Sequence, residues 1–408
     1  MAGLIFFLQI TKMRSQIARF EPFNLLWSNL CLMAHKIFIA GAGGIGQAAA
    51  ILLREWSENA PDIVLGDISR EHLDEAAAFV LHGSESTGSL ETLEMPAGEA
   101  SGELLSVFDS CDVLLDCAPG REAPKLARYS REHSMHYANL TEYVAETDQI
   151  KALARDAETG FVLQTGLAPG FVNVLAVSLY DQFVEEFDNR NVERISMKVG
   201  ALTAHAHAPH FYGFTWSPIG VATEYVKNSR VVRDHKITEL PALSEREEIV
   251  IGGRRFEADL TSGGAADLPE HFALRARALD YKTIRHVGHF EWASRVIHEF
   301  ANDEHLPRQV LKRFLREIPA VEDDFVLVHA GVEGFDSEGV RRLLEKAFFV
   351  NPLEINGKIL RAIQTTTAAP LCEAAMMLLS GDHKGVVLQS GIDPKTFLNG
   401  RFVSRVYS

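Results

Sequence analysis

The chain has 408 residues, of which 47% are hydrophobic and 23% charged, so it is long enough for two domains with substantial cores. It carries 40 basic and 55 acidic residues, for a formal net charge of −15. With no run of basic residues, this acidity argues against a nucleic acid or an anionic membrane as partner. The cysteines, 4 in all, form neither a metal-type pair nor a disulfide framework, which fits a reducing cytosol and a cytoplasmic protein.

Residues 1–34 are predicted to lie outside the fold. The apolar piece Leu4–Ile10 is too short to span a bilayer and has no basic residues before it. No small-residue cleavage site follows the second apolar patch, Phe23–Met33. We interpret the segment as an upstream extension, with Met33 as the functional start. A membrane anchor or a signal peptide is the alternative, and mass spectrometry of the native N-terminus separates the two.

The stretch His35–Asp67 carries the elements of a dinucleotide-binding unit in chain order. The apolar run Ile37–Ala40 predicts a buried parallel strand, and apolar residues at helical spacing behind it predict a helix. Between them the chain reads GAGGIG, which fills a G-x-G-x-x-G frame, and a second apolar run ends in Asp67. Strand, glycine turn, helix, strand and acid in this order favour a nucleotide site over an α/β unit without a ligand.

The glycines and the acid have separate physical tasks. Glycines permit a tight turn and a close approach to a pyrophosphate, and the following helix N-terminus offers free N–H groups to it. Asp67 can accept hydrogen bonds from a ribose 2′-hydroxyl and repels a 2′-phosphate, so NAD is expected; Arg70, just past it, leaves NADP as the alternative. The predicted cofactor-binding residues are Gly41, Gly43, Gly44, Ile45, Gly46, Asp67, Ile68, Ala118, Pro119 and Thr141.

Strands and helices alternate up to residue 165, which defines a dinucleotide-binding domain over 35–165. The crossovers are long enough for right-handed connections, so the pattern predicts a doubly wound parallel (Rossmann) sheet of α/β class. In such a sheet the loop Ala118–Gly120 borders the nicotinamide ribose. The expected helices are Glu71–Leu81, Glu122–His133 and Ala145–Glu158, and the expected strands are 91–95, Asp112–Ala118, Met135–Leu140 and Gly160–Thr165.

From residue 166 the pattern changes and predicts a second α+β domain, residues 166–364, with a mixed or antiparallel sheet. Phe171–Tyr180 is expected to be helical, and Asn356-Gly357 indicates a hairpin between the last two strands. The helix Thr365–Leu379 is expected to bring the segment 365–408 back to the first domain. The expected strands are Arg194–Leu202, Lys236–Leu240, Glu248–Leu260, Tyr281–Val287, Phe325–Gly334, Lys346–Asn351 and Lys358–Gln364.

Several segments together resemble the saccharopine dehydrogenase family, in the branch shared with L-lysine 6-dehydrogenases. They are GAGGIG, GLAPGFVN at 166–173, TWSP at 215–218, TSGG at 261–264 and YKTIRHVGH at 281–289. The resemblance covers about residues 36–400 in the family's order. It implies a Rossmann domain and a mixed-sheet domain that holds an amino-acid substrate and often mediates dimerisation, hence a homodimer. It also implies lysine metabolism by hydride transfer between a nicotinamide and the carbon bearing an amine, with hydrolysis of the imine.

The resemblance also assigns charged groups to the substrate. Arg285 matches the arginine of the family's T-x-R-x-x-G-H stretch and is expected to bind a substrate carboxylate, with a solvated strand-end arginine as the alternative. Members that act on saccharopine often have an arginine after Trp-Ser-Pro, where this chain has Ile219. Glu224 is closer to lysine 6-dehydrogenase and carboxynorspermidine-type members; it either faces a substrate ammonium or lies on an exposed helix face.

The remaining candidates are less specific. Trp216 is expected as an apolar wall or as a core residue, and Asn173 either reaches the interdomain cleft or caps its helix. Lys282 and His289 are the candidate catalytic residues, because imine formation needs a group that takes the amine proton near neutral pH. The expected substrate-binding residues are Asn173, Thr215, Trp216, Ser217, Glu224 and Arg285.

Two further readings compete with this one. His205, His207 and His210 suggest a metal site, but no carboxylate or cysteine is spaced nearby as a further ligand, so no metal is expected. A non-catalytic NAD-binding sensor or scaffold is the alternative of another class, and it predicts nucleotide affinity without turnover.

Overall fold

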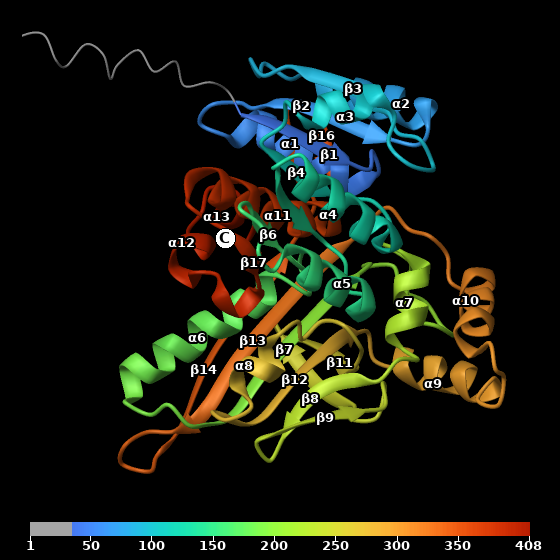
Figure 1. Ribbon diagram of the computed structural model, residues 1–408. Helices are drawn as coiled ribbons and strands as arrows, with labels where there is room; N and C mark the ends of the chain where they lie inside the picture. Colours follow the sequence, from blue (N-terminus) through green and yellow to red (C-terminus); the bar gives the residue numbers. More distant parts are fainter. Residues whose placement is uncertain (1–34) are drawn as a thin grey trace, which may run out of the picture.

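The computed structural model describes residues 35–408; the predicted extension, 1–34, lies outside the described part. Within residues 35–408 a 7-stranded parallel sheet and an 8-stranded mixed sheet organise the chain (Figure 1). This confirms the predicted α/β class, with a doubly wound sheet and a second domain built on a mixed sheet.

Parallel strands form the first sheet: β1 (Lys36–Ala40), β2 (Asp62–Asp67), β3 (Leu90–Glu94), β4 (Val113–Asp116), β5 (His136–Asn139), β6 (Gly160–Val162) and β17 (Gly385–Val387). Their order is β17-β6-β5-β4-β1-β2-β3. The direction of winding reverses at β1, because β2 lies on one side of it and β4 on the other. In open α/β sheets ligands bind outside the carboxyl ends of the strands at such a reversal.

Helices connect these strands: α1 (Gly44–Trp56), α2 (Arg70–Leu81), α3 (Gly102–Phe108), α4 (Ala123–Glu132) and α5 (Val144–Ala154). Helix α2 starts where Ser69 Oγ accepts a hydrogen bond from the backbone N–H of His72. Helix α3 is absent from the sequence interpretation, because so short a segment shows too little helical spacing; Ser101 caps it through the N–H of Leu104.

The second sheet contains β7 (Val192–Leu202), β8 (Ser229–Arg233), β9 (Lys236–Leu240), β10 (Glu247–Ile251), β11 (Arg254–Leu260), β12 (Ala276–Arg285), β13 (Phe325–Phe335) and β14 (Arg341–Val350). Its main order is β10-β11-β12-β7-β13-β14, and β8 pairs with β12 and β9. Strands β12 and β7 are parallel while their other neighbours run antiparallel, so the sheet is mixed.

Two strand predictions were wrong in detail. The predicted strand Glu248–Leu260 is the hairpin β10–β11, which turns at Gly252 and Gly253. Both glycines have positive φ, +56° and +76°, a left-handed conformation that side chains disfavour. An uninterrupted strand would require both residues to be extended.

The Asn356-Gly357 turn forms, with φ of 51° and 75°, and the strand after it starts at Lys358 as predicted, but the strand before it is not the predicted one. It connects the short strands β15 (Leu353–Ile355) and β16 (Lys358–Leu360). The predicted strand Lys346–Asn351 belongs instead to β14, which pairs with β13. Helix α11 (Ala362–Ser380) begins inside the predicted last strand.

Helices of the second domain are α6 (Phe171–Phe187), α7 (Pro218–Glu224), α8 (Leu268–Phe272), α9 (His289–Glu299) and α10 (Leu306–Glu317). The chain then returns to the first domain (Figure 1): α11 packs on α1, and β17 pairs with β6. The short helices α12 (Pro394–Leu398) and α13 (Val403–Val406) follow α11. Among residues 35–408, every helix is too short or too polar to cross a membrane.

Candidate functional site

A cleft of about 670 Å³ lies between the domains, at the carboxyl edge of the first sheet. The first domain contributes Gly44, Ile45 and the segments 117–121 and 140–143. The second domain contributes residues from the stretch 215–224 and from β12. The cleft therefore places the glycine turn and the charged groups of the second domain on one continuous cavity.

The glycine turn is packed tightly except where a ligand would approach. The N–H of Gly41 donates to the carbonyl of Gly66 at 2.7 Å. A Cβ at Gly46 would lie 1.9 Å from the carbonyl oxygen of Gly41, so only glycine fits where helix and turn cross. A Cβ at Gly43 would meet nothing within 4 Å. Because Gly43 is the N-cap of α1, this open space adjoins the helix N-terminus, and the turn fits a dinucleotide pyrophosphate.

Asp67 ends β2 and stabilises the glycine turn. Its Oδ2 accepts a hydrogen bond from the N–H of Ala42 at 2.8 Å, and its Oδ1 accepts one from Ser69 at 3.0 Å. A carboxylate has further lone pairs, so a ribose hydroxyl can still donate to it. Ile68, beside it, is 69% exposed. Arg70 binds Asp74 on its own helix, at 2.7 and 3.0 Å.

The segments after β4 and β5 bring Ala118, Pro119 and Thr141 to the cleft wall. The buried Asp116 holds the first of these loops, because it accepts hydrogen bonds from the N–H of Ala118 at 3.0 Å and from the hydroxyl of Tyr137 at 2.7 Å. Burial raises the pKa of Asp116 to about 7. The sequence interpretation included this strand end without assigning a role to the acid.

Arg285, at the end of β12, lines the cleft and is anchored from behind. Its Nη2 donates to Glu224 Oε1 at 3.3 Å, its Nε donates to the hydroxyl of Tyr225 at 2.7 Å, and its Nη1 donates to the carbonyl of Ile284 at 3.0 Å. The guanidinium also lies 4.5 Å from the centre of the Tyr212 ring. Most of its donors are therefore in use, and the nearest negative charge comes from the protein itself.

His289 is buried and does not line the cleft. Its Nδ1 lies 2.6 Å from the carbonyl of His210, so this nitrogen carries the proton and Nε2 accepts from the hydroxyl of Tyr225 at 3.0 Å. Burial lowers the pKa of His289 to about 3, which keeps the ring neutral. Its position revises the expectation of a proton carrier: His289 is a positioning residue that fixes Tyr225 and, through it, Arg285.

Replacing Tyr225 by phenylalanine is expected to lower the free energy of unfolding by about 1–3 kcal/mol, because Arg285 Nε and His289 Nε2 would both lose their buried partner. Urea denaturation of the two proteins measures the difference. The matched control is Tyr180→Phe, which removes a single bond to the carbonyl of Arg190 and should cost less. Equal losses in the two variants would contradict the proposed role of this chain of hydrogen bonds.

Lys282 is likewise turned away from the cleft. Side chains alternate along a strand, so Tyr281, Thr283 and Arg285 line the cleft and Lys282 points to the opposite face. There its Nζ donates to the carbonyl of Glu245 at 2.6 Å and lies 3.2 Å from Glu247 Oε1. The expectation that Lys282 carries a proton at the substrate is therefore replaced by a structural role in this face of the sheet.

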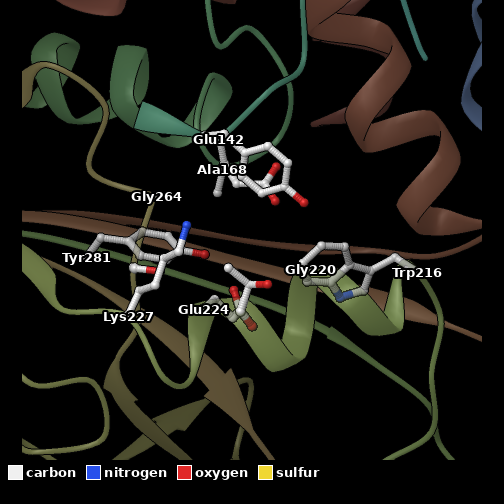
Figure 2. A pocket seen from close by; sticks show the side chains of 11 residues that line it. Glu142, Ala168, Trp216, Gly220, Glu224, Lys227, Gly264 and Tyr281 are labelled. Carbon is white, nitrogen blue, oxygen red and sulfur yellow. The ribbon is translucent and has the colours of Figure 1, made fainter. Parts of the chain in front are cut away.

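Two glutamates face the cleft from opposite domains (Figure 2). Glu224, at the end of α7, has a side chain only 13% exposed. Burial raises the pKa of Glu224 to about 8; the charge of Arg285 opposes this shift, and that of Glu142 adds to it. Burial also raises the pKa of Glu142. The sequence interpretation missed Glu142, although an acid just past a predicted strand end was a usable indication.

The TWSP segment forms part of the second wall. Ser217 caps α7, since its Oγ accepts a hydrogen bond from the N–H of Gly220 at 3.2 Å. The Trp216 ring lies on that helix turn, where a Cβ at Gly220 would come within 2.4 Å of it. Thr215 is buried on the cleft wall, and within residues 35–408 its hydroxyl has no hydrogen-bond partner.

Asn173 takes the capping role of its two expected alternatives. Its Oδ1 accepts a hydrogen bond from the N–H of Gly170 at 2.7 Å at the start of α6. Its Nδ2 donates to the carbonyl of Gly264 at 3.0 Å, so it joins this helix to the TSGG turn. Asn173 does not line the cleft.

Residues from the start of α11 complete the first wall. Gln364 Nε2 donates to the carbonyl of Gly44 at 3.2 Å, and its Oε1 accepts from the N–H of Arg361 at 2.8 Å. The Arg361 side chain lines the cleft. No sequence pattern indicated these residues, because the fold brings them to the glycine turn from a distant part of the chain.

The histidine-rich loop, residues 205–210, is where the sequence suggested a metal site. His205 Nε2 lies 3.8 Å from Asp323 on the surface, and His210 contributes its carbonyl to His289. Within residues 35–408 there is no group of three or more histidine, cysteine, aspartate or glutamate side chains placed to hold a metal ion.

A glycine turn at the reversal of a doubly wound sheet, facing a second domain across a cleft, defines a class: two-domain oxidoreductases that bind a nicotinamide dinucleotide. The family model of the saccharopine dehydrogenase NADP binding domain matches residues 37–163, and that of the saccharopine dehydrogenase C-terminal domain matches residues 166–401. The chain belongs to the saccharopine dehydrogenase family, which confirms the resemblance read from its motifs.

Individual relatives are distant. Mitochondrial alpha-aminoadipic semialdehyde synthase is 24% identical over 152 residues in Mus musculus and 23% identical over 151 residues in Rattus norvegicus. Each match covers 35% of this chain and only 16% of the relative's length.

Solved structures share the fold over nearly the whole chain. Saccharopine dehydrogenase (L-Glu forming) from Saccharomyces cerevisiae has a TM-score of 0.66 at 14% identity, covering 91% of this chain and 97% of its own. Homospermidine synthase from Legionella pneumophila, solved in complex with NAD, has a TM-score of 0.63 at 12% identity, covering 92% and 90%. At these identities the likeness shows the fold alone.

Proposed function

We propose that this protein is an NAD(P)-dependent oxidoreductase acting on the CH–NH group of an amino acid, in a saccharopine dehydrogenase-like reaction of lysine metabolism. The observation that carries the proposal is the cleft of about 670 Å³, which joins the glycine turn and its neighbouring loops to Glu224 and Arg285. When bound, the nicotinamide supplies the hydride acceptor. The protein has to hold the amine, receive its proton and keep the reacting carbon at the cofactor.

The side chains of the cleft fit these tasks. Arg285 and Arg361 are the cations available to a substrate carboxylate, and Trp216 offers an apolar wall for an aliphatic chain. Glu224 is the group we assign as proton acceptor, because it lines the cleft and its pKa of about 8 lies near neutrality. It replaces Lys282 and His289 in this role.

The alternative substrates are lysine itself, as for an L-lysine 6-dehydrogenase, and a carboxynorspermidine-type amine. Glu224 lines the cleft and favours a substrate that carries an ammonium group. Arg285 is already paired with Glu224. The fold shared with a homospermidine synthase is compatible with a polyamine-related substrate. The alternative of another class, an NAD-binding sensor or scaffold, retains the glycine turn and requires no proton acceptor.

A substrate screen tests the proposal. Saccharopine, lysine and carboxynorspermidine are each incubated with NAD+ and NADP+, and the reduced cofactor is followed by its absorbance. Turnover of one of them supports the oxidoreductase and identifies the branch. Nicotinamide binding without turnover of any amine would favour the sensor or scaffold.

Asp67→Ser is expected to weaken NAD+ binding by about 10- to 100-fold and NADP+ binding far less, because it removes a charged acceptor for the ribose hydroxyl and a charge that repels a 2′-phosphate. Calorimetric titration with each nucleotide measures the ratio of affinities. Asp148→Ser is the control, since this exposed residue of α5 lies away from the turn. An unchanged ratio would rule out Asp67 as the source of NAD preference.

A further inference from the structure

The start of helix α11 lies on the glycine turn, although the two segments are far apart in the chain (Figure 1). A Cβ at Gly44 would come within 2.6 Å of Gln364 Nε2, so glycine at this position leaves the room that the Gln364 side chain occupies. The same nitrogen donates to the carbonyl of Gly44 at 3.2 Å, and Gln364 Oε1 accepts from the backbone N–H of Arg361 at 2.8 Å. One side chain thus ties the backbone of Arg361 to the first residue of α1.

The Arg361 side chain lines the cleft on the same wall as Gly44 and Ile45. Within residues 35–408 its ionic partner is Glu322, whose Oε2 lies 3.5 Å from Arg361 Nη1. The Glu322 side chain is 90% exposed, and exposed ion pairs of this kind contribute little to stability. A guanidinium has five N–H donors, so Arg361 retains donors that a ligand in the cleft can use.

The N-terminus of α11 does not itself offer an anion site. The backbone N–H groups of Ala362 and Ile363 each donate at 2.7 Å to the carboxylate of Asp324, a buried residue of the second domain. Asp324 also places a negative charge at the positive end of the helix dipole. An anion beside the start of α11 therefore has to be bound through the Arg361 side chain.

The other cations that line the described cleft are placed differently. Arg285 pairs with Glu224 at 3.3 Å, and Arg121 has a side chain 80% exposed that lies 3.5 Å from Glu122. Each phosphate of a dinucleotide carries a negative charge, whereas the N-terminus of a helix supplies only about half a positive charge. Arg361 is the cleft-lining cation that the fold fastens to the glycine turn, so it fits the charge that the helix leaves unbalanced.

We propose that Arg361 binds the pyrophosphate of the dinucleotide, and that Gln364 is the positioning residue that holds Arg361 at the turn. The cofactor site then includes the segment that returns from the second domain, in addition to the N-terminal unit with the glycine motif. This assigns to the cofactor a cation that could otherwise serve a substrate carboxylate. The inference rests on the proposed function, because the proposed function supplies the bound dinucleotide.

The test compares ligands that contain no nicotinamide. The full-length protein is titrated calorimetrically with ADP-ribose, which carries the pyrophosphate, and with adenosine, which lacks it. Arg361→Met should weaken ADP-ribose binding by about 10- to 100-fold, the effect of losing a charge-assisted hydrogen bond, and leave adenosine binding unchanged. Gln364→Met should weaken ADP-ribose binding in the same selective way but less, because Arg361 loses its anchor and keeps its charge.

Salt separates a lost charge contact from a change in shape. Screening weakens an ion pair, so ADP-ribose affinity should fall more steeply with salt in the unmodified protein than in Arg361→Met. Arg361→Lys keeps the charge and should retain the steep dependence. Arg295→Met is the matched control, since it removes a 68% exposed cation of α9 that does not line the cleft, and it should bind ADP-ribose as the unmodified protein does.

Equal ADP-ribose affinity in Arg361→Met and the unmodified protein would overturn the pyrophosphate contact. Equal losses of adenosine and ADP-ribose affinity would overturn it too, because the variant would then disturb the whole nucleotide site. Failure of the proposed function looks different. If ADP-ribose binds through Arg361 while no amine is oxidised, the contact stands and the dehydrogenase assignment fails. If an amino acid is oxidised while Arg361→Met binds ADP-ribose normally, the reverse holds.

Discussion

Gly46→Ala is expected to abolish nicotinamide binding and to lower the free energy of unfolding by about 1–3 kcal/mol. The added methyl group would lie 1.9 Å from the carbonyl oxygen of Gly41, so α1 has to move away from the turn or the turn has to open. Helix propensity acts in the opposite direction, because alanine is favoured over glycine inside a helix by about 1 kcal/mol. A net loss of stability would therefore reveal the contact itself.

Gly43→Ala, three positions before Gly46 in the same motif, is the matched control. Its φ of −69° suits alanine, and its Cβ would meet nothing within 4 Å. Stability should change by no more than about 0.5 kcal/mol, whereas NAD+ affinity should fall because the methyl group enters the space at the helix N-terminus. Calorimetry with NAD+ and urea denaturation separate the two effects. Normal NAD+ binding by Gly46→Ala would show that the turn is not the nucleotide site.

The fold was largely predictable because its signals are local. The apolar run Ile37–Ala40, the glycines and the following helical spacing are adjacent in the chain, and each constrains the next. The β/α alternation to residue 165 then determined a parallel sheet. Errors fell on tight turns such as Gly252-Gly253, where one or two residues decide whether a strand continues. The helices α9 and α10 were also missing from the prediction.

The site was less predictable, for two physical reasons. Strand β12 is buried on both faces over most of its length, so no apolar–polar alternation tells which of its residues face the cleft. Lys282 and Arg285 were therefore both predicted to lie at the substrate, although they point to opposite sides. Glu142 and Arg361 reach the cleft from segments far from the motifs, and only the tertiary fold brings them there.

Burial also shifts the pKa of a side chain away from the value typical of its residue type. His289 has the side chain most often used for proton transfer near neutral pH, yet desolvation keeps it neutral behind Tyr225. Burial raises the pKa of Glu224 instead, to about 8, so its carboxyl group titrates near neutral pH. Residue identity alone pointed to His289 as a proton carrier, whereas the environments of the two groups support the role that we propose for Glu224.

Glu224→Gln is accordingly expected to reduce kcat by roughly 100- to 10,000-fold, the range for loss of a general base. In the unmodified protein kcat/KM should rise with pH and level off above about 8, because only the ionised carboxyl can take the amine proton. The residual activity of the variant should lack this rise. A pH profile of both proteins, with Glu291→Gln on the exposed side of α9 as control, measures the effect. An unchanged profile would exclude Glu224 as the base.

Stability supplies an independent measure of the same ionisation. The pKa of Glu224 is raised in the folded state, to about 8, so its contribution to stability is fully present below the ordinary carboxyl pKa and is lost as the pH rises through 8. Glutamine cannot ionise, so the unfolding free energy of the variant should gain on that of the unmodified protein across this window. Urea denaturation at several pH values gives the difference between the two curves, in which the titration of other groups largely cancels. A difference that stays flat with pH would mean that Glu224 is not the desolvated carboxyl on which the proton transfer depends.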